Sequence, residues 1–432
     1  MGRLQGCRPD EAVQIAGMTT PGKPQSCGLP LVGFGGLGQW QHMSVLSALS
    51  VSRIPAMAFV VIGVFWGTFA AMVPVTKARL GVNDAVFGSL LLCSAAGLLT
   101  AMFLAPKLEA WLGGRGMQIV AALFAVVMLL PGVVETPLAF ALTMVALGLA
   151  SGTLDVLMNA RVSALEAREG RALMNANHGA FSIAYAISAV ATGLAREAEI
   201  GAALIFGACA VCIAVIAMQL WMPVDAVEAP PDGQGRVPLV PVLLCGAVVL
   251  LAFSGEAAVE AWSALHIERT LGGGAVEGAL GPAMLGLTMA LGRFSGQAVS
   301  ERINEMRIIV IGTVLAMVGA VLAAVAPSVA VAYLGFGVLG LGVSVIGPIG
   351  IGIAGRLVPP WARTVVVART AVLGFMAFFI APMVMGVVSE AFGLRVAFLV
   401  IGGIVGLIFV FLPGISRLQS GSVLPGGTAA QR

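Results

Sequence analysis

Charged side chains are scarce in this sequence. Asp, Glu, Lys and Arg make up 10% of its 432 residues, whereas they make up about 25% of an average soluble domain. The formal net charge is only +3 and no basic patch is interleaved with aromatic residues, so no nucleic-acid partner is expected. Hydrophobic residues account for 59% of the chain, and the mean hydropathy is +1.03. This composition predicts an integral membrane protein.

Motifs of catalysis and metal binding are also lacking. Cys209 and Cys212 have the spacing of a redox or metal pair, but they lie in an apolar run without a second pair or a nearby His. We interpret them as packing residues. The sequence contains no phosphate-binding loop and no nucleophile triad. We therefore expect no enzyme activity, no metal and no cofactor.

Long apolar stretches are abundant instead. A membrane-spanning helix needs about 20 apolar residues, and twelve such stretches can be placed in the sequence. They run over 55–75, 85–105, 116–134, 138–159, 177–195, 201–222, 239–264, 278–299, 307–326, 329–355, 365–388 and 395–415. The predicted fold class is an all-α membrane protein, with twelve transmembrane helices in two pseudo-symmetric six-helix bundles.

Composition also marks the boundaries of these bundles. The first 52 residues mix Gly, Pro, Gln and Ser with short apolar pieces, which favours a disordered cytoplasmic tail; alternatively, translation begins at Met43. A polar segment rich in Pro and Gly is typical of a linker. The predicted order is a tail over 1–52, a bundle over 53–223, a cytoplasmic linker over 224–237, a bundle over 238–416 and a tail over 417–432.

Lys and Arg are distributed unequally between the two sides of the membrane. With both termini on one side, 18 of the 23 basic residues lie on that side. The opposite, outer segments hold Lys77, Arg79, Arg196, Arg269 and Arg395. Cytoplasmic loops carry the excess of basic residues. We therefore predict cytoplasmic termini in a multi-pass protein of the cell inner membrane.

The two halves of the chain are alike in outline. Short charged loops follow the second and the eighth predicted spans, at 107–115 and 300–307. We assign structural roles near the inner surface to Arg115, Arg171, Arg293, Glu301 and Arg302. Repeated halves are typical of secondary transporters, whose binding site lies between the halves near the bilayer centre.

Three motifs carry polar residues inside these apolar stretches. The first contains Asp155, Val156, Met158, Asn159, Gly170, Arg171, Leu173, Met174, His178, Gly179, Phe181 and Ser182. The second runs from Glu256 to Ala264, and the third runs from Gly374 through Phe375 to Pro382. Together these motifs resemble the major facilitator superfamily, and more narrowly its sugar and rhizopine permease branch, the MosC/YbjJ-like transporters. The chain departs from the family patterns at Met72, Ala261 and Ala110–Trp111.

The resemblance implies both a fold and an activity. The family alternates access between the two membrane faces, and the implied solute is small, polar and sugar-like. It would bind between spans 1, 4, 5, 7, 10 and 11, with Phe375 as a contact or gate. Because the chain has no ATP-binding module, we expect the proton gradient to drive transport. The expected partners are the solute, protons and the lipid bilayer, and the expected state is a monomer.

Two alternatives to this function stay open. The first is an efflux antiporter for an amphipathic compound, although two Tyr and an aromatic content of 6% argue against a broad aromatic pocket. The second is a non-transporting membrane receptor, which should carry an extra soluble domain. No connecting segment of this sequence is long enough for one.

Glu256 and Glu260 are the leading candidates for proton coupling. They are four residues apart and so share a helix face. An acid at lipid depth costs about 2.5–3.5 kcal/mol on insertion scales, so its presence suggests a function. A pair of carboxyls this close could hold a proton that exchanges as solute binds. Alternatively, Glu260 lies near the outer end and simply reaches water.

Asp155 and Asn159 also share a helix face, at the inner part of the fourth span. Asp155 could bind a proton or a cation, with Asn159 as a solute contact. The interpretation we prefer for Asp155 is structural: it pairs with Arg161 or Arg171, which lie nearby in the sequence.

Three further residues have two interpretations each. His178 could relay a proton or contact solute, or it could make a hydrogen bond between helices. Trp262 could stack on a sugar, or it could lie at the membrane interface. Arg293 lies inside the eighth span, and we expect its side chain to extend to the inner surface.

Overall fold

The computed structural model describes residues 45–223, 237–300 and 303–421. Every regular element within these ranges is helical, which confirms the predicted all-α class. In chain order the elements are α1 (Val45–Val51), α2 (Arg53–Leu80), α3 (Asp84–Leu112), η1 (Gly113–Arg115), α4 (Gly116–Val127), η2 (Leu130–Gly132), α5 (Pro137–Glu169), α6 (Met174–Glu197), α7 (Ala202–Ala217), α8 (Leu239–Leu265), η3 (His266–Thr270), α9 (Ala275–Ser300), α10 (Glu305–Val325), α11 (Val329–Arg356), α12 (Pro360–Phe375), α13 (Ala377–Gly406) and α14 (Ile408–Gly421).

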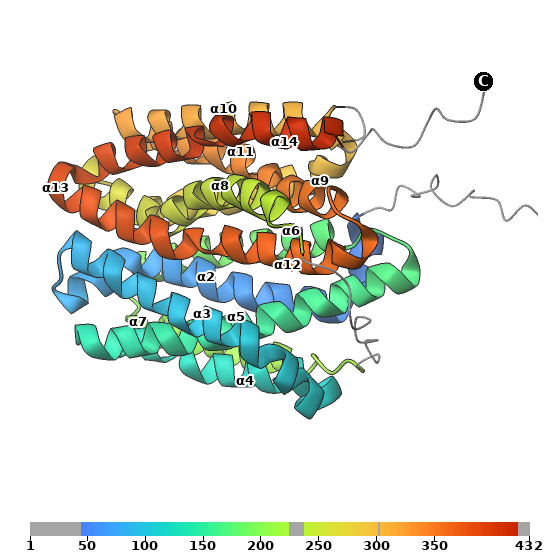
Figure 1. The fold of residues 1–432 in the computed structure, drawn as a ribbon. Helices are drawn as coiled ribbons and strands as arrows, with labels where there is room; N and C mark the ends of the chain where they lie inside the picture. The colour runs from blue at the N-terminus through green and yellow to red at the C-terminus, as the bar shows by residue number, and fades with distance from the viewer. Residues whose placement is uncertain (1–44, 224–236, 301–302, 422–432) are drawn as a thin grey trace, which may run out of the picture. The chain divides into compact units, whose positions relative to one another are not determined.

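The long helices lie side by side with their axes nearly parallel (Figure 1). Helices α2 to α7 pack among themselves and form the N-terminal group, while α8 to α14 form the C-terminal group. The two groups meet where α6 packs against α9 and where α3 packs against α13. The division into two six-helix bundles stays a prediction, and the predicted linker lies outside the described residues except for Val237.

Capping residues of the sequence set the ends of these helices. The Asn83 side chain accepts a hydrogen bond from the Val86 amide (2.9 Å) and so begins α3. At the other end of α5, Gly170 adopts a left-handed conformation (φ 63°), which a glycine accepts without strain. The turn that follows is held by Glu166, whose carboxylate accepts hydrogen bonds from the first amides of α6. This turn fixes the connection between the Asp155 and His178 segments.

Length and composition make nine of the helical segments in the described ranges able to cross a membrane. Two of these segments, 84–132 and 365–420, are 49 and 56 residues long, far beyond the about 20 residues that one crossing needs. In the second of them Gly393 has a non-helical backbone (φ 83°) that divides α13. Helix α7 is apolar but has only 16 residues. Each of the twelve predicted stretches overlaps at least one helix, and the number of crossings stays a prediction.

Small residues allow the helices to approach closely. A Cβ atom on Gly148 of α5 would lie 1.9 Å from the backbone oxygen of Ser94 in α3. Across α10 and α11, a Cβ atom on Gly312 would lie 2.6 Å from the backbone oxygen of Gly342. Larger residues at these positions would separate the helices. Close backbone packing of this kind is typical of membrane helices, which gain nothing from hydrophobic association in lipid.

The structure changes the predicted boundaries of both tails. Residues 45–51, which we assigned to the N-terminal tail, form α1, and the hydroxyl of buried Ser52 donates to the Ala48 carbonyl oxygen (3.0 Å). At the other end α14 continues to Gly421, beyond the predicted start of the C-terminal tail. The rest of the two tails, 1–44 and 422–432, lies outside the described residues.

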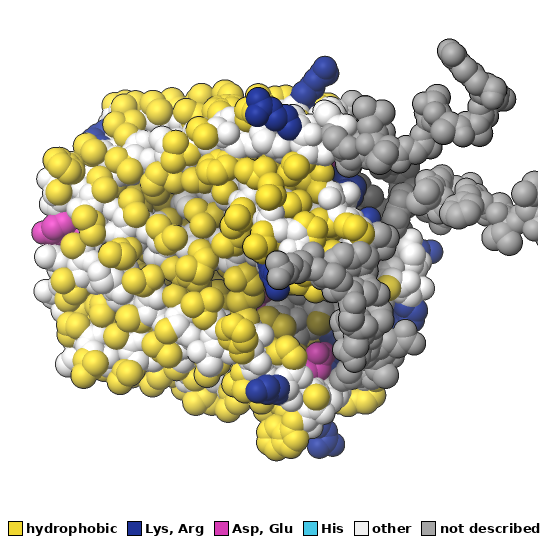
Figure 2. Space-filling view, in the orientation of Figure 1, with side chains coloured by type: hydrophobic (Ala, Val, Ile, Leu, Met, Phe, Trp, Pro, Cys, Tyr) yellow, Lys and Arg dark blue, Asp and Glu magenta, His cyan; other side chains and the backbone are white. Residues whose placement is uncertain are grey.

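Hydrophobic side chains cover the face of the molecule that spans α2, α3, α12 and α13 (Figure 2). Charged side chains on this face lie mainly toward the two ends of the helices. Some of the largest apolar side chains are almost fully exposed, for example Phe103 at 80% and Leu138 at 72%. Such exposure is unfavourable in water but suits a surface that contacts lipid.

Candidate functional site

A cavity of about 220 Å³ lies between the two groups of helices. Helices α2, α3, α5 and α6 line one side, and α8, α9, α12 and α13 line the other. The helices that line the cavity differ in part from spans 1, 4, 5, 7, 10 and 11, between which we expected the solute; where the solute binds stays a prediction. The second and eighth spans contribute through α3 and α9, whereas α11 contributes none of the described lining residues.

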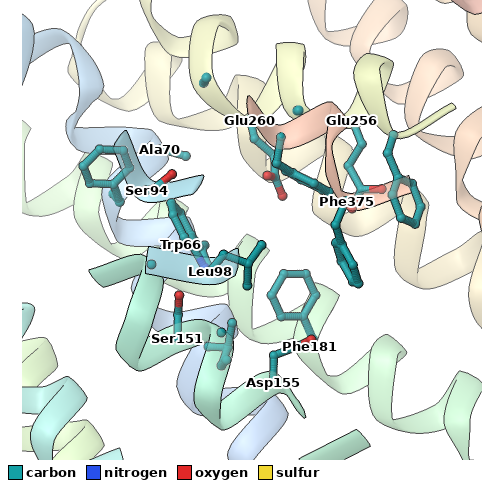
Figure 3. Close-up of a pocket in the computed structure, with 18 of the residues that line it drawn as sticks. Trp66, Ala70, Ser94, Leu98, Ser151, Asp155, Phe181, Glu256, Glu260 and Phe375 are labelled. Atoms are coloured by element: carbon teal, nitrogen blue, oxygen red, sulfur yellow. The ribbon is translucent and has the colours of Figure 1, made fainter. Parts of the chain in front are cut away.

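Acidic side chains face each other across this cavity. Glu256 and Glu260 come from α8, and Asp155 comes from α5 on the opposite side, next to Ser151 (Figure 3). Arg293 of α9 and His178 of α6 complete the ionisable lining. The described lining thus contains three carboxyl groups, one guanidinium and one imidazole. The polar groups expected from the sequence at Asp155, His178, Glu256 and Glu260 do meet at one cavity.

Glu256 has a basic partner within its own group of helices. Its carboxylate lies 3.4 Å from the guanidinium of Arg293, and both side chains are largely buried, at 6% and 10% exposure. The expectation that Arg293 extends to the inner surface was wrong. An arginine at this depth finds a carboxylate more easily than water, because a buried charge needs a partner.

Arg293 also reaches the other group of helices. Its Nη1 atom donates to the hydroxyl of Ser182 (2.5 Å) and to the backbone oxygen of His178 (3.4 Å), both on α6. The guanidinium carbon lies 6.0 Å from the centre of the Phe181 ring, within the range of a cation–π contact. Arg293 therefore joins Glu256 on one side of the cavity to α6 on the other.

Glu260 lies one helical turn from Glu256 and is half-buried at the cavity wall. Within the described ranges no basic side chain forms an ion pair with it. Figure 3 shows the Glu260 carboxylate directed toward the side of the cavity that carries Trp66 and Ser94. Two acids four residues apart thus differ in partnership: Glu256 is paired and Glu260 is not.

Asp155 is held by its own helix. Asn159 donates to the Asp155 carboxylate (3.1 Å) and to its backbone oxygen (2.8 Å). Of the two partners that we predicted for Asp155, Arg161 was wrong, because it is buried against Glu109 of α3 (3.0 Å). The pairing with Arg171 stays a prediction. Asn159 itself does not line the cavity in the described structure. Its described hydrogen bonds go to Asp155, whose carboxylate it can orient.

The remaining predicted contacts divide into two kinds. His178 and Phe375 line the cavity, and the His178 ring packs edge-on against Phe59 with centroids 4.8 Å apart. Trp262 is fully buried away from the cavity, where its ring meets Phe87 at 6.0 Å. Both interpretations of Trp262, as a sugar-stacking ring and as an interface residue, therefore need correction.

Aromatic rings are concentrated at this cavity far more than composition suggests. The chain has 20 Phe, 6 Trp and 2 Tyr, and eight of these 28 rings line the cavity. They are Phe59, Trp66, Phe69, Phe181, Phe253, Phe375, Phe378 and Phe379. A low overall aromatic content thus does not exclude an aromatic binding site. Apart from Phe375 and the motif residue Phe181, these rings and the hydroxyls of Ser94 and Ser151 could not be predicted as lining residues, because nothing in the chain brings these positions together before folding.

The predicted inner-surface residues differ in their surroundings. Arg115 is exposed in η1, and Arg171 is half-buried in the turn between α5 and α6. Glu301 and Arg302 lie outside the described residues. The resemblance between halves appears instead in two ion pairs, Glu109 with Arg161 and Glu305 with Arg356. Glu109 lies near the end of α3, the second helix of its group, and Glu305 begins α10, the third helix of its group. Their partners Arg161 and Arg356 both lie in the inner part of the fourth helix, α5 or α11.

Metal ligation does not explain this arrangement. Within the described part of the chain, no group of three or more His, Cys, Asp or Glu side chains could hold a metal ion. What the cavity offers is three carboxyl groups, an imidazole, a guanidinium that contacts both groups of helices, and aromatic walls.

Comparison with known proteins gives consistent matches over most of the chain. The family model described as Major Facilitator Superfamily matches residues 55–338 and 283–427. The chain is 29% identical to the membrane protein MosC of Rhizobium meliloti, over 89% of this chain and 94% of MosC. It is 28% identical to an MFS-type transporter of Yersinia pestis, over 87% of this chain and 97% of that one. A crystal structure of a bacterial homolog to the human lysosomal transporter Spinster, inward-facing and unoccupied, shares the fold with a TM-score of 0.72. That match has 13% identity over 88% of this chain and 99% of the other.

Proposed function

Because this chain belongs to the Major Facilitator Superfamily, we propose that it moves a small polar, sugar-like solute across the membrane together with protons. Family membership makes it a multi-pass transporter rather than an enzyme, as the sequence predicted. The match to MosC agrees with the narrower resemblance. The proposal adds the solute class and the coupling ion. Its main support is the Glu256–Arg293 pair at a cavity between two helix groups.

The charge of the cavity favours a solute that is not an anion. Three carboxyl groups and one guanidinium face the space, and the guanidinium already contacts Glu256 and Ser182. An anion would meet uncompensated carboxylates in a setting where charges are poorly screened. A polyol or sugar can donate its hydroxyls to these carboxylates and to Ser151. The aromatic rings then contact the apolar faces of the same solute.

Arg293 provides a route from proton binding to movement. Glu256 and the α6 acceptors compete for one guanidinium, since Arg293 contacts both. When Glu256 takes up a proton it loses its negative charge, and its hold on Arg293 weakens. Arg293 then interacts more strongly with α6 or with a bound solute. A ligand that changes the contact between two rigid groups shifts the equilibrium between access states, and here the ligand is a proton.

The proposal includes a setting in the cell. The chain would lie in the cell inner membrane as a monomer with both termini in the cytoplasm, as the distribution of basic residues indicates. The solute and protons would enter in the same direction, as a symport. Reconstituted protein labelled with an impermeant reagent at either terminus would test the orientation.

The test of coupling is uptake into proteoliposomes under an imposed pH gradient. A mixture of labelled neutral sugars, polyols and nucleosides is offered with the gradient directed inward, and internal solutes are measured by mass spectrometry. Glu256→Gln should still bind the accepted solute while losing most of the stimulation by the gradient. Glu135→Gln, which changes an exposed carboxyl at the end of the helices, is the matched control and should transport normally. Unchanged pH dependence in Glu256→Gln would remove this residue from the coupling mechanism.

A second candidate function is export of an amphipathic compound in exchange for protons. The eight aromatic rings of the cavity favour it, because aromatic walls bind apolar surfaces well. The same proteoliposomes separate the two functions. Proton-driven accumulation of a neutral sugar supports the first, and proton-driven extrusion of a preloaded aromatic compound supports the second.

A further inference from the structure

Two neighbouring residues of opposite charge join the two helix groups at the predicted outer end. Glu268 and Arg269 lie next to each other in η3, the turn that follows α8. Glu268 pairs with Arg196 at the end of α6, and Arg269 pairs with Asp84 at the start of α3. We call these four residues the outer latch. Neither pair was expected from the sequence, and neither contributes to the cavity lining.

The pair between Glu268 and Arg196 has two parallel hydrogen bonds. Nη1 of Arg196 donates to Oε1 at 2.7 Å, and Nη2 donates to Oε2 at 2.9 Å. Nη1 also donates to the backbone oxygen of Ala71 in α2 (2.7 Å). The Arg196 side chain is 9% exposed. This fork-to-fork geometry gives stronger and more directional contact than a single hydrogen bond.

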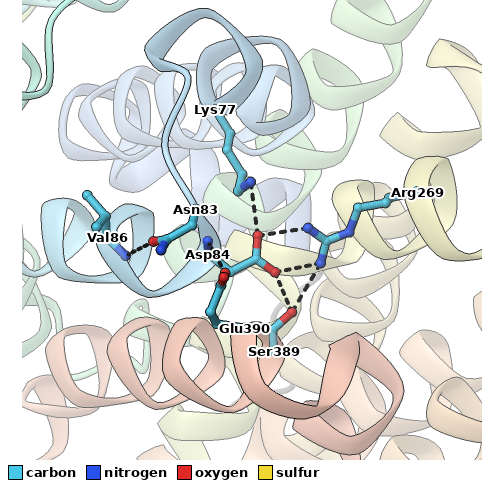
Figure 4. A network of polar contacts seen from close by, with 7 residues as sticks. All are labelled: Lys77, Asn83, Asp84, Val86, Arg269, Ser389 and Glu390. Carbon is cyan, nitrogen blue, oxygen red and sulfur yellow. Dashed lines mark hydrogen bonds and ion pairs between the residues drawn. The ribbon is translucent and has the colours of Figure 1, made fainter.

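The pair between Arg269 and Asp84 has the same geometry. Its two hydrogen bonds measure 2.7 Å and 2.6 Å. The Asp84 carboxylate also contacts Lys77 (3.0 Å) and accepts a hydrogen bond from Ser389 of α13 (2.5 Å). Figure 4 shows these groups converging on Asp84, while Glu390 accepts from its backbone amide. Asp84 is thus the point where α2, α3, η3 and α13 meet.

The turn that carries both residues is a π-helix rather than an α-helix. The first two residues of this turn are fixed, because His266 and Ile267 are buried and a ring nitrogen of His266 lies 3.1 Å from the Ala323 backbone oxygen. Its end is closed by the Gly273 amide, which donates to Ile267, after Gly272 with φ 73°. A π-turn spaces its hydrogen bonds one residue further apart than the α-helix, so it accommodates one inserted residue, and it is frequent at functional sites. Without that extra residue, the positions beyond it would rotate by about 100°.

Glu268 also rests against a glycine of the next helix. A Cβ atom on Gly278 of α9 would lie 2.2 Å from Oε1 of Glu268. Since Oε1 is the far end of a flexible side chain, an alanine there would displace the carboxylate and leave the fold intact. The carboxylate would then lose its alignment with Arg196. The chain therefore offers a way to disturb the latch without changing any charge.

From these contacts we propose that η3 acts as one latch that keeps the predicted outer end closed, and that a shift of this turn from π to α register releases both ion pairs together. Since Glu268 and Arg269 are adjacent on one short turn, a rotation that moves one must move the other. The two pairs hold different helices of the N-terminal group, α6 and α3, so their loss removes one ion pair from each of these two contacts between the groups. The latch depends on the proposed function in one respect only, which is that the protein alternates access between the two membrane faces.

Cysteine labelling tests the latch without any substrate. In a full-length variant whose native cysteines are replaced by Ser, Ser94→Cys places one thiol on the cavity wall. A membrane-impermeant maleimide is applied from each face of sealed vesicles in turn. From the Asp84 end, labelling should be slow in this parent. Glu268→Gln, Arg269→Gln and Gly278→Ala should each accelerate it, on the order of tenfold, a typical size for coupling between sites.

The double variant Glu268→Gln/Arg269→Gln distinguishes one latch from two independent pairs. If the turn acts as a unit, each single variant should come close to the rate of the double variant. A double rate equal to the product of the single effects would overturn the proposal, as would unchanged rates in all three. The exchange Arg196→Glu with Glu268→Arg restores an ion pair and should slow labelling again, which shows that the single variants were folded. A failure of proton-driven uptake alongside these labelling results would count against the proposed transport function alone.

Discussion

The cavity and the outer latch both contain buried ion pairs, but the pairs are built differently. At the cavity, Arg293 contacts Glu256 through one interaction of 3.4 Å. At the outer latch, Arg196 and Arg269 each make two parallel hydrogen bonds of 2.6–2.9 Å. Burial does not explain the difference between Arg293 and Arg196, whose side chains are 10% and 9% exposed, and Arg269 keeps the short geometry although it is 41% exposed. The central pair therefore has the looser geometry and the pairs at the end have the tighter one, as the proposed coupling and latch roles require.

The two sites also differ in the number of contacts that each charged group makes with its ionic partners. Arg293 makes one contact of 3.4 Å with its carboxylate partner Glu256 and directs its other donors to α6. Asp84 instead receives Arg269, Lys77 and Ser389 at once, all at 3.0 Å or less. An ion pair with several short contacts costs more to separate than one with a single long contact. A transporter needs both kinds, one to respond to its ligands and one to define its closed state.

The largest effect should follow from removing the Asp84 charge. Asp84→Asn leaves Arg269 and Lys77 without their carboxylate, and removal of one partner from a buried pair costs about 3–5 kcal/mol. We expect about 3 kcal/mol in the free energy of unfolding, because the Arg269 side chain is 41% exposed and solvent screens part of the loss. Thermal unfolding in detergent measures it. Ser389→Ala, which removes one hydrogen bond only, is the control, and equal losses in the two variants would contradict a special role for Asp84.

A smaller effect on stability is expected at the centre. Arg293→Gln leaves Glu256 buried without a base, and we expect a loss of about 2 kcal/mol because the contact is already long. Adding Glu256→Gln removes the unpaired carboxylate charge, so the double variant should recover at least half of the lost stability. Unfolding curves of the two single variants and the double variant give the coupling between the residues. Losses that simply add would mean that the two side chains do not interact.

The smallest effect should come from Asn159. Asn159→Ala removes the hydrogen bond to the Asp155 carboxylate, and a hydrogen bond of this kind contributes about 1 kcal/mol. Unfolding should therefore be only slightly easier, while solute affinity falls if Asp155 needs to be oriented. Binding is measured with the solute identified by the uptake screen. Asp155→Asn, which removes the carboxylate charge itself, gives the loss of affinity against which Asn159→Ala is compared. Normal affinity in Asn159→Ala would assign Asn159 to helix packing alone.

The sequence predicted the helices and much of the cavity for a clear physical reason. Acids and amides are rare in lipid-length apolar runs, so Asp155, His178, Glu256 and Glu260 were conspicuous, and all four line the cavity. Helical periodicity could have excluded Trp262. It follows Glu260 by two residues, which is about 200° around a helix and so on the opposite face.

The partners of charged residues could not be predicted in the same way. Arg293 lies seven residues before the end of α9, close enough for its side chain to reach the inner surface by length alone. Only the packing of α6 and α8 against α9 turns it toward Glu256. The outer latch joins residues 72 and 185 positions apart, and no local pattern specifies such pairs. Likewise, eight rings spread over 59–379 converge only after folding.

The adjacency of Glu268 and Arg269 has a consequence for the energy source of transport. A unit charge that crosses the membrane field exchanges about 2.3 kcal/mol per 100 mV with it. Glu268 and Arg269 carry opposite charges on one turn, so a displacement of that turn carries no net charge through the field. Opening of the latch would then be electrically silent, and any voltage dependence of the transport cycle would arise from the proton and the solute.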